Sequence, residues 1–378
     1  MHAASPYFDD THRLLRDTLR RFVEKEVLPH AQGWEEQGFV PRAVLREMGR
    51  CGFLGLRYPE KYHGGAMNAL ATALLAEELG RSGFGGFAAT VLVHTDMASP
   101  HLMHSGSPTQ LERWMPGIVA GDLITAVAVT EPDAGSDVKA IRTAARREGG
   151  AWRLRGTKMF ITNGALAELV FVAAKTDPAA GAKGISMFAV ERGVPGFSVG
   201  RRLDKMGWRC SDTAELVFED APAELVGEEG RGFYAIMRNF QNERIALAAM
   251  AMGESARALE LTLEFVRTRK AFGATLWEKQ AVRQRLASLA ARVEAGRELV
   301  YRAAWLDAQG ADCVKEVSMA KAYCGELTNE VMYACLQFHG GFGYVRESAI
   351  ERMYRDARVQ SIGGGATEVM LEEVAKRL

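Results

Sequence analysis

Apolar residues in the N-terminal third of the chain follow the spacing of amphipathic helices. They recur every three or four positions after Asp10 and so share one face of a helix. Apolar runs that end at Gly or Pro predict further helices over residues 69–79, 87–103 and 108–120, with a turn at 59–65. The residues of the first helical face are Leu15, Leu19, Phe22, Val23 and Val27.

From about Leu123 the alternation changes to a period of two, which is typical of strands with one buried face. Turn-forming pairs such as Gly149 with Gly150 and Asp177 with Pro178 separate the apolar runs. The pattern predicts a small, mostly antiparallel β domain. Its strands are expected over residues 123–130, 141–147, 152–155, 169–176, 185–191 and 215–220.

After Gly227 the helical period returns and continues to the end of the chain, with few helix breakers. The fold class is therefore mainly α with a central β domain. We expect an N-terminal helical domain over residues 1–121, a central β domain over 122–227 and a C-terminal helical domain over 228–378. The sequence has no internal repeat and no flexible linker, so close packing of the three domains is predicted.

Composition narrows the possible functions. The 378 residues include 47 Lys plus Arg and 47 Asp plus Glu, and this zero net charge argues against binding to nucleic acid or anionic membranes. Apolar residues make up 48% of the chain, yet no uncharged run is long enough to span a bilayer. The five cysteines show neither disulfide-framework density nor CxxC spacing, and the acidic N-terminus does not resemble a leader. A reduced, cytoplasmic protein is expected.

Two segments have the composition of ligand-binding loops. Residues 128–137 leave a strand and place Ala134 and Gly135 among hydroxyl and carboxylate groups, where backbone amides can approach a planar or anionic ligand. A polar connection capped by Asp137 is the alternative. The second segment is QFHGGFG, residues 337–343, in which three glycines permit close approach of the backbone to a diphosphate, at the N-terminus of a following helix if one is present. The alternative is a turn that terminates the preceding helix.

Other reactive side chains point to no separate site. His101 and His104 have helical spacing but lack a third ligand, so no metal site is expected. Cys313, Cys324 and Cys335 recur every eleven residues and are predicted to lie in the core. The same prediction holds for the two methionines Met250 and Met252.

Four ordered motifs, which together extend over most of the chain, resemble those of the acyl-CoA dehydrogenase family. This resemblance implies three domains, namely N-terminal helices, a central β-barrel-like domain and a C-terminal four-helix bundle. It also implies a homotetramer with one FAD per subunit. The motifs are TEPDAGSD at 130–137, KMFITNG at 158–164, RKAFG at 269–273, and QFHGGFG at 337–343 followed by YRD at 354–356.

The resemblance also assigns cofactor-binding residues. Phe160 takes a position where the family more often has Trp, and the Thr162 hydroxyl is expected near the hydride-accepting nitrogen of the flavin. The adenosine diphosphate half is expected to be held across a subunit interface. The implied flavin contacts are Ala128, Thr130, Gly135, Ser136, Phe160, Ile161 and Thr162, the contacts across the interface are Arg269, Phe272, Gln280, Gln337, Gly340 and Gly341, and two further contacts are Thr367 and Glu368.

Two glutamates, Glu243 and Glu368, are candidates for the catalytic base. Many family members carry a Glu where this chain has Gly364, whereas a subset that includes the long-chain and isovaleryl-CoA enzymes carries the base on an earlier helix, where this chain has Glu243. Glu243 is therefore expected to remove the α proton of an acyl-CoA. Glu368 is the rival. The Gly364 amide is expected to stabilise the enolate-like charge, and Ser136, Arg244 and Gly365 to contact the substrate.

The resemblance leaves several functions open. An FAD-dependent dehydrogenase would form a trans-2,3-enoyl-CoA and pass electrons to an electron-transferring flavoprotein. The alternatives on the same scaffold are an acyl-CoA oxidase, a flavin monooxygenase, or a relative that binds nucleic acid, which the zero net charge disfavours. The consecutive glycines 363–365 are expected to leave space near the substrate's α and β carbons, which favours long or branched acyl groups.

Overall fold

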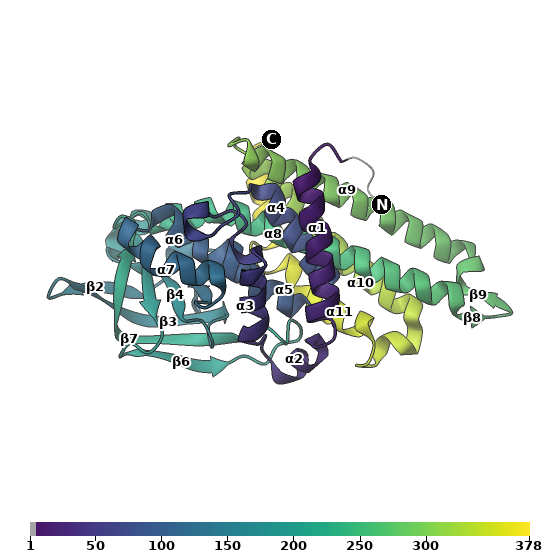
Figure 1. Cartoon of the computed structure of the whole chain (residues 1–378), viewed down its shortest axis with the longest axis horizontal. Helices are drawn as coiled ribbons and strands as arrows, with labels where there is room; N and C mark the ends of the chain where they lie inside the picture. Colours follow the sequence, from purple (N-terminus) through teal and green to yellow (C-terminus); the bar gives the residue numbers. More distant parts are fainter. Residues whose placement is uncertain (1–4) are drawn as a thin grey trace.

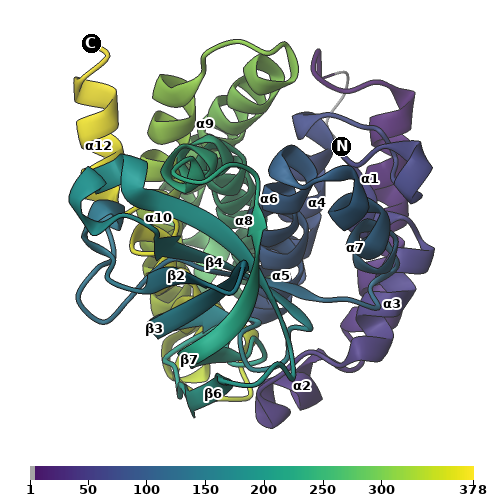
Figure 2. The ribbon, with the colours of Figure 1, turned by 90° about the vertical axis from the view of Figure 1, so that its left-hand side faces the viewer.

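The computed structural model describes residues 5–378, and the chain runs from N-terminal helices through a β domain to C-terminal helices (Figure 1). This order confirms the predicted fold class. Viewed from the end that carries the β domain, the strands lie in front of the helices (Figure 2). Among the described residues, none of the helices combines the length and apolar character needed to cross a bilayer.

The N-terminal helices largely follow the predicted pattern. An important difference is that residues 87–103 do not form one helix, because Pro100 cannot donate a backbone hydrogen bond and a π-helical turn, Val93–Ala98, separates two helices there. The helices are α1 (Asp10–Phe22), α2 (Ala31–Gln37), α3 (Arg42–Arg50), α4 (Ala69–Arg81), α5 (Gly85–Leu92), α6 (Ser99–Ser105) and α7 (Pro108–Ala120).

The β domain is a seven-stranded sheet in the order β1-β4-β2-β3-β7-β5, with β6 paired to β7. An additional pairing of β4 with β5 closes the sheet into the expected barrel-like form. The pairs are antiparallel except β1 with β4 and β2 with β4. The strands are β1 (Thr125–Ala128), β2 (Ala144–Glu148), β3 (Ala151–Thr162), β4 (Leu169–Lys175), β5 (Ile185–Glu191), β6 (Phe197–Arg202) and β7 (Thr213–Val226).

The C-terminal helices include three long ones that run past the N-terminal helices and extend beyond them (Figure 1). A short hairpin of β8 and β9 connects α8 to α9 at the projecting end. The elements are α8 (Gly232–Thr268), β8 (Lys270–Ala271), β9 (Ala274–Thr275), α9 (Gln280–Ala308), α10 (Val314–His339), α11 (Ala349–Ala357) and α12 (Thr367–Ala375).

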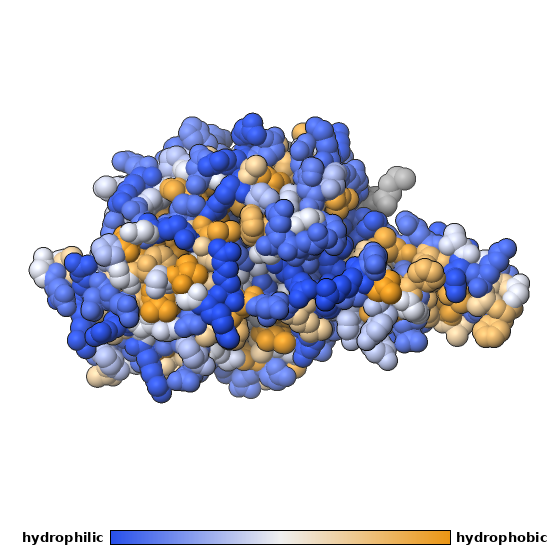
Figure 3. All heavy atoms as spheres, turned by 90° about the horizontal axis from the view of Figure 1, so that it is seen from below, coloured by the Kyte–Doolittle hydropathy of each residue, from blue (hydrophilic) through white to orange (hydrophobic). Residues whose placement is uncertain are grey.

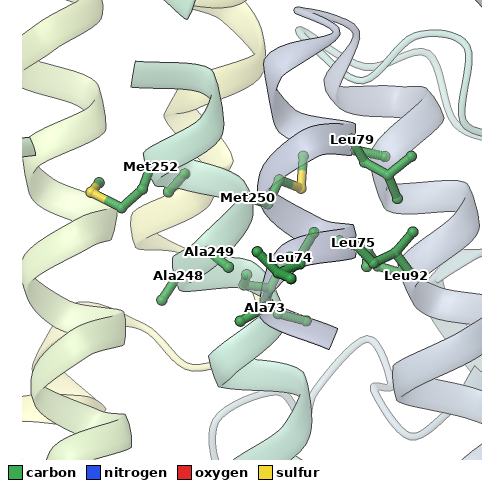
Figure 4. Packing of buried hydrophobic residues seen from close by; sticks show 14 of the residues in the cluster. Ala73, Leu74, Leu75, Leu79, Leu92, Ala248, Ala249, Met250 and Met252 are labelled. Atoms are coloured by element: carbon green, nitrogen blue, oxygen red, sulfur yellow. The ribbon is translucent and has the colours of Figure 1, made fainter. Parts of the chain in front are cut away.

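The core between α4 and α8 fixes the position of the helix that carries Glu243. Met250 of α8 points toward α4 and Met252 points to the opposite side (Figure 4), and both are buried, as predicted. Gly80 of α4 faces the backbone of α8, and a Cβ there would overlap the Met250 carbonyl group. Cys313, Cys324 and Cys335 are also buried, in agreement with the sequence.

Candidate active site

A buried ion pair fixes the loop that leaves β1. Lys158 of β3 donates from Nζ to Oε1 of Glu131 at 2.7 Å and to the Val129 carbonyl at 2.9 Å. The Glu131 carboxylate also accepts backbone N–H groups from Arg142 and Thr143. Burial lowers the pKa of Lys158 to about 8, although the charge of Glu131 opposes this shift. The loop is therefore held against β3 before any ligand binds.

The loop and the end of β3 bring several predicted flavin contacts together. Thr130 accepts a hydrogen bond from the Met159 backbone at 2.9 Å, and Gly135 and Ser136 are exposed. Two of the predicted contacts, Ala128 and Ile161, instead have their side chains buried in the core of the β domain. Any contact they make with a ligand on the surface of the sheet must use backbone atoms.

Phe160 lies at an irregularity in the pairing of β3 with β7. The register shifts between Lys158 and Ile161, and Phe160 has a φ of 61°. Its ring is 65% exposed, which is unusual for a large apolar side chain in a strand. Thr162, two residues later, is half-buried. The strand end therefore presents an aromatic ring next to a hydroxyl group.

The glutamate of α8 lies against the glycine loop at residues 363–365. Gly364 has a φ of 63°, and a Cβ built on it would lie 3.1 Å from Oε1 of Glu243. A side chain at position 364 would therefore point into the space that the Glu243 carboxylate borders. The sequence predicts that a glutamate at position 243 replaces the one that many relatives carry at position 364. The geometry of the described residues supports this prediction.

Glu243 has the electrostatic environment of a general base. Burial raises the pKa of its carboxyl group to about 6, although the positive charges of Arg244 and Lys321 lower it. A carboxylate with a pKa close to neutral is ionised at pH 7 and can still hold a proton in a transition state. Glu368, the rival, is exposed in the first turn of α12.

Arg244 lies beside the same loop. Its guanidinium stacks over the Phe240 ring at 5.1 Å, and its Nε is buried and has no hydrogen-bond partner among the described residues. A Cβ on Gly365 would come 3.4 Å from that Nε and 2.8 Å from Cε of Met370. A buried donor without a partner is costly, which indicates that a ligand or water satisfies it.

The expectation of open space at residues 363–365 is wrong. A Cβ on Gly364 would overlap the Leu247 side chain, and a Cβ on Gly365 would crowd Met370. Neighbouring side chains have filled the volume that the missing side chains leave, as close packing requires. The glycines therefore do not by themselves explain a preference for branched acyl groups.

A second group of predicted contacts gathers where the long helices project. Arg269 lies over the Phe342 ring at 5.5 Å, and His339 stacks on Phe265 at 4.4 Å. Phe272, in the β8–β9 hairpin, is 98% exposed. Gln280, Gln337, Gly340 and Gly341 are also exposed.

The QFHGGFG segment does not begin an α-helix. Gly340 follows the last residue of α10 and starts a short 3-10 helix, Gly340–Tyr344, and α11 starts only at Ala349, so the alternative of a turn that terminates α10 is correct. Gly340 has a φ of 58°, and a Cβ on either Gly340 or Gly341 would meet no atom within 4 Å. The backbone there is accessible to a ligand without a helix N-terminus.

Comparison with known proteins decides the family. Models of the N-terminal, middle and C-terminal domains of acyl-CoA dehydrogenase match residues 9–122, 126–221 and 230–378. The chain belongs to the acyl-CoA dehydrogenase family. This acyl-CoA dehydrogenase is an FAD-dependent oxidoreductase, as its relatives are.

Individual relatives cover nearly the whole chain. The mouse mitochondrial long-chain specific acyl-CoA dehydrogenase is 41% identical over 98% of this chain and 87% of its own length. The human mitochondrial short-chain specific enzyme is 37% identical over 98% and 90%. The crystal structure of an acyl-CoA dehydrogenase from Geobacillus kaustophilus has a TM-score of 0.96 at 40% identity, with 99% of each chain covered.

The residues present in this acyl-CoA dehydrogenase fit FAD. The exposed Phe160 ring offers an apolar surface for a planar ring system, and Ser136 offers an exposed hydroxyl group on the loop whose Thr130 carbonyl binds the Met159 N–H. Arg269 and the unobstructed backbone of Gly340 and Gly341 suit a diphosphate. When bound, FAD would supply a hydride acceptor.

The two groups of predicted FAD contacts lie toward opposite ends of the chain. Figure 1 shows β3 in the β domain at one end and the β8–β9 hairpin at the other. Completion of the site across a subunit interface stays a prediction from the sequence.

No metal centre accompanies these groups. Among residues 5–378, no cluster of three or more His, Cys, Asp and Glu side chains is placed to hold a metal ion. His101 is buried, and burial lowers its pKa to about 4. It is a packed neutral side chain.

Two interactions were not predicted from the sequence. Glu131 and Lys158 both lie within the quoted motifs, but only their spatial pairing shows that they join the loop to β3. Lys321 lies in no motif. A lysine among the apolar positions of α10 was the available signal, because a lysine on a buried helix face requires polar partners.

Proposed function

We propose that this enzyme removes the α proton and the β hydrogen of an acyl-CoA to give a trans-2,3-enoyl-CoA, with Glu243 as the base. The observation that carries the proposal is the 3.1 Å approach of Oε1 of Glu243 to the Cβ position of Gly364, where other family members carry the base. The raised pKa of Glu243 supports the same role. The α proton would pass to the Glu243 carboxylate, and the β hydrogen would be transferred with its two electrons, as hydride, to the flavin.

Other residues near Glu243 are proposed to bind the substrate. The Gly364 N–H would donate to the thioester carbonyl as negative charge develops there, because a backbone donor needs no side chain. Arg244 and Gly365 would border the acyl group, which agrees with the unpartnered Nε of Arg244. Ser136 would approach the CoA portion, in agreement with its exposure.

We propose a medium-chain, long-chain or branched acyl-CoA as the substrate. Support for a long chain comes from the 41% identity to a long-chain specific relative, compared with 37% to a short-chain specific one. The filled space at Gly364 and Gly365 removes the earlier argument for branching, so that part of the proposal depends on experiment alone.

The proposed assembly is a homotetramer that shares each FAD between subunits. Separation of the two groups of contacts supports this sharing (Figure 1). Apolar residues also gather along the projecting end on the face shown in Figure 3. Phe272 in the β8–β9 hairpin is 98% exposed, and Tyr344 is 83% exposed. The proposed location is the cytoplasm, which the five unpaired cysteines support, and the proposed acceptor is an electron-transferring flavoprotein.

Anaerobic bleaching of the flavin tests this function. The holoenzyme is mixed with butyryl, octanoyl, palmitoyl and isovaleryl thioesters, and loss of flavin absorbance is followed before reoxidation with oxygen or an electron-transferring flavoprotein. We expect bleaching by the longer thioesters and rapid reoxidation only by the flavoprotein. Rapid reoxidation by oxygen would instead identify an oxidase, and no bleaching by any thioester would contradict the proposal.

A further inference from the structure

A buried lysine on α10 donates hydrogen bonds to backbone carbonyls in and next to the glycine loop at residues 363–365. Lys321 of α10 is 2% exposed, and its Nζ donates to the carbonyls of Gln360 at 2.5 Å and Gly365 at 3.2 Å. These two carbonyls lie on either side of Gly364. A lysine with so little exposure is unusual unless its charge has a specific role, because burial of an ammonium group is costly.

The loop that Lys321 binds is the one that faces the base. Gly364 lies against the carboxylate of Glu243, and Gly365 lies against Nε of Arg244. The Gln360 carbonyl precedes Gly364 in the chain and the Gly365 carbonyl follows it, so the two hydrogen bonds hold both ends of the segment that carries the Gly364 N–H, the proposed donor to the thioester. The position of the loop is thus coupled to the ammonium group through two hydrogen bonds.

Lys321 also contributes to the electrostatics of the base. The charged groups that act on Glu243 are Arg244, on the same helix, and Lys321, on α10. Arg244 in turn interacts with Glu373 and Arg377 at the end of α12, and Lys321 interacts with Glu326. Lys321 therefore adds a positive charge that acts on Glu243 from a different helix. Burial lowers the pKa of Lys321 to about 8, so the ammonium group is still mainly protonated at pH 7.

We propose that Lys321 is a positioning residue for the dehydrogenation, which fixes the segment that carries the Gly364 amide through hydrogen bonds to the Gln360 and Gly365 carbonyls. This inference rests on the proposed function. Lys321 acts through the loop and through its charge, and it contacts neither the substrate nor the reacting atoms.

Three variants at position 321 separate the effect of the side-chain charge from the effect of the side-chain volume. Lys321→Met and Lys321→Gln remove the charge, and Gln keeps one donor in case the Met variant does not fold. Lys321→Arg keeps the charge. Lys315→Met is the matched control, because Lys315 lies on the same helix, is half-buried and donates to the Arg377 carbonyl, away from the glycine loop. The readouts are FAD content, kcat and KM for the best thioester, and the pH profile of kcat.

The expected result has a definite sign. A protonated Glu243 cannot accept the α proton, so kcat falls below its pKa. Loss of the Lys321 charge raises that pKa, and the acidic limb should move up by about one pH unit. The shifted limb alone should lower kcat at pH 7 by about twofold, and displacement of the Gly364 amide should bring the total loss in both uncharged variants to about tenfold or more with little change in KM. Lys321→Arg and Lys315→Met should keep the wild-type limb.

Two results would overturn the inference. The first is a limb and kcat in the uncharged holoenzymes that match wild type. The second is failure of both uncharged variants to fold with FAD, which would show a structural requirement instead. Parallel measurement of Glu243→Gln distinguishes failure of the inference about Lys321 from failure of the proposed function. Retained turnover in Glu243→Gln refutes the base itself, whereas an unmoved limb in Lys321→Met refutes only the positioning role.

Discussion

A methyl group at Gly364 should disturb the base without removing it. Gly364 has a φ of 63°, and a Cβ on it would overlap Leu247 and lie 3.1 Å from Oε1 of Glu243. In Gly364→Ala the loop must either keep a left-handed backbone or move away from α8. Either response displaces Glu243 relative to the Gly364 amide, so chemistry is expected to suffer more than cofactor binding.

The magnitude follows from the two costs. A non-glycine residue in the left-handed region costs about 1–2 kcal/mol, and the holoenzyme should lose roughly that much stability. A displacement of about 1 Å between catalytic groups can reduce a rate by about a hundredfold. We therefore expect kcat of Gly364→Ala to fall between about tenfold and a hundredfold while FAD content stays at the wild-type level.

The adjacent glycine provides a matched control. A Cβ on Gly363 would lie 3.5 Å from Cγ2 of Val359 and 3.7 Å from its carbonyl oxygen, which are ordinary contacts. Gly363→Ala should keep kcat within about twofold of wild type. Stopped-flow reduction of the flavin and thermal unfolding are measured for both variants. Equal reduction rates in Gly363→Ala and Gly364→Ala would refute the proposed contact between the loop and the base.

Two further predictions concern assembly and pH. Arg269→Ala should weaken FAD retention and the oligomer together, because Arg269 is exposed at the end of the chain that a partner is proposed to cover. Gel filtration with flavin absorbance checks this, and an FAD-free but intact oligomer would contradict it. For Glu254, burial raises the pKa to about 8, so the native state holds a proton that the unfolded chain releases above about pH 4.5. Stability should therefore fall as pH rises from about 4.5 to 8, and Glu254→Gln should flatten this dependence of the melting temperature. Parallel curves for the variant and wild type would show that Glu254 does not titrate in that range.

Local sequence patterns predicted most of the helices and strands. The helix over residues 108–120 matches α7 because Ser107 caps it and Gly121 ends it in the left-handed conformation, and both signals are local. By contrast, β6 (Phe197–Arg202) was missed, because its residues are mostly exposed and alternate weakly. Pairing of β6 with β7 depends on distant residues, which no local pattern reveals.

The sequence predicted which residue is the base, but it did not predict which side chains pack around that residue. The resemblance selected Glu243 because position 364 is a glycine and lacks a carboxylate, and the two residues lie side by side in the structure. The same reasoning expected empty space at Gly364, because sequence cannot show that Leu247, one helical turn after Glu243, fills it. Lys321 was missed for the same reason, since its partners are backbone carbonyls without a sequence signature.

The role of Glu243 is tested most directly by one comparison of anaerobic flavin reduction. Glu243→Gln and Glu368→Gln are each loaded with FAD and mixed with the thioester that bleaches wild type fastest. An amide cannot accept the α proton, so reduction in Glu243→Gln should slow by about a thousandfold or more while Glu368→Gln stays close to wild type. Near-normal reduction in Glu243→Gln, or an equal collapse in Glu368→Gln with FAD still bound, would contradict the assignment of the base.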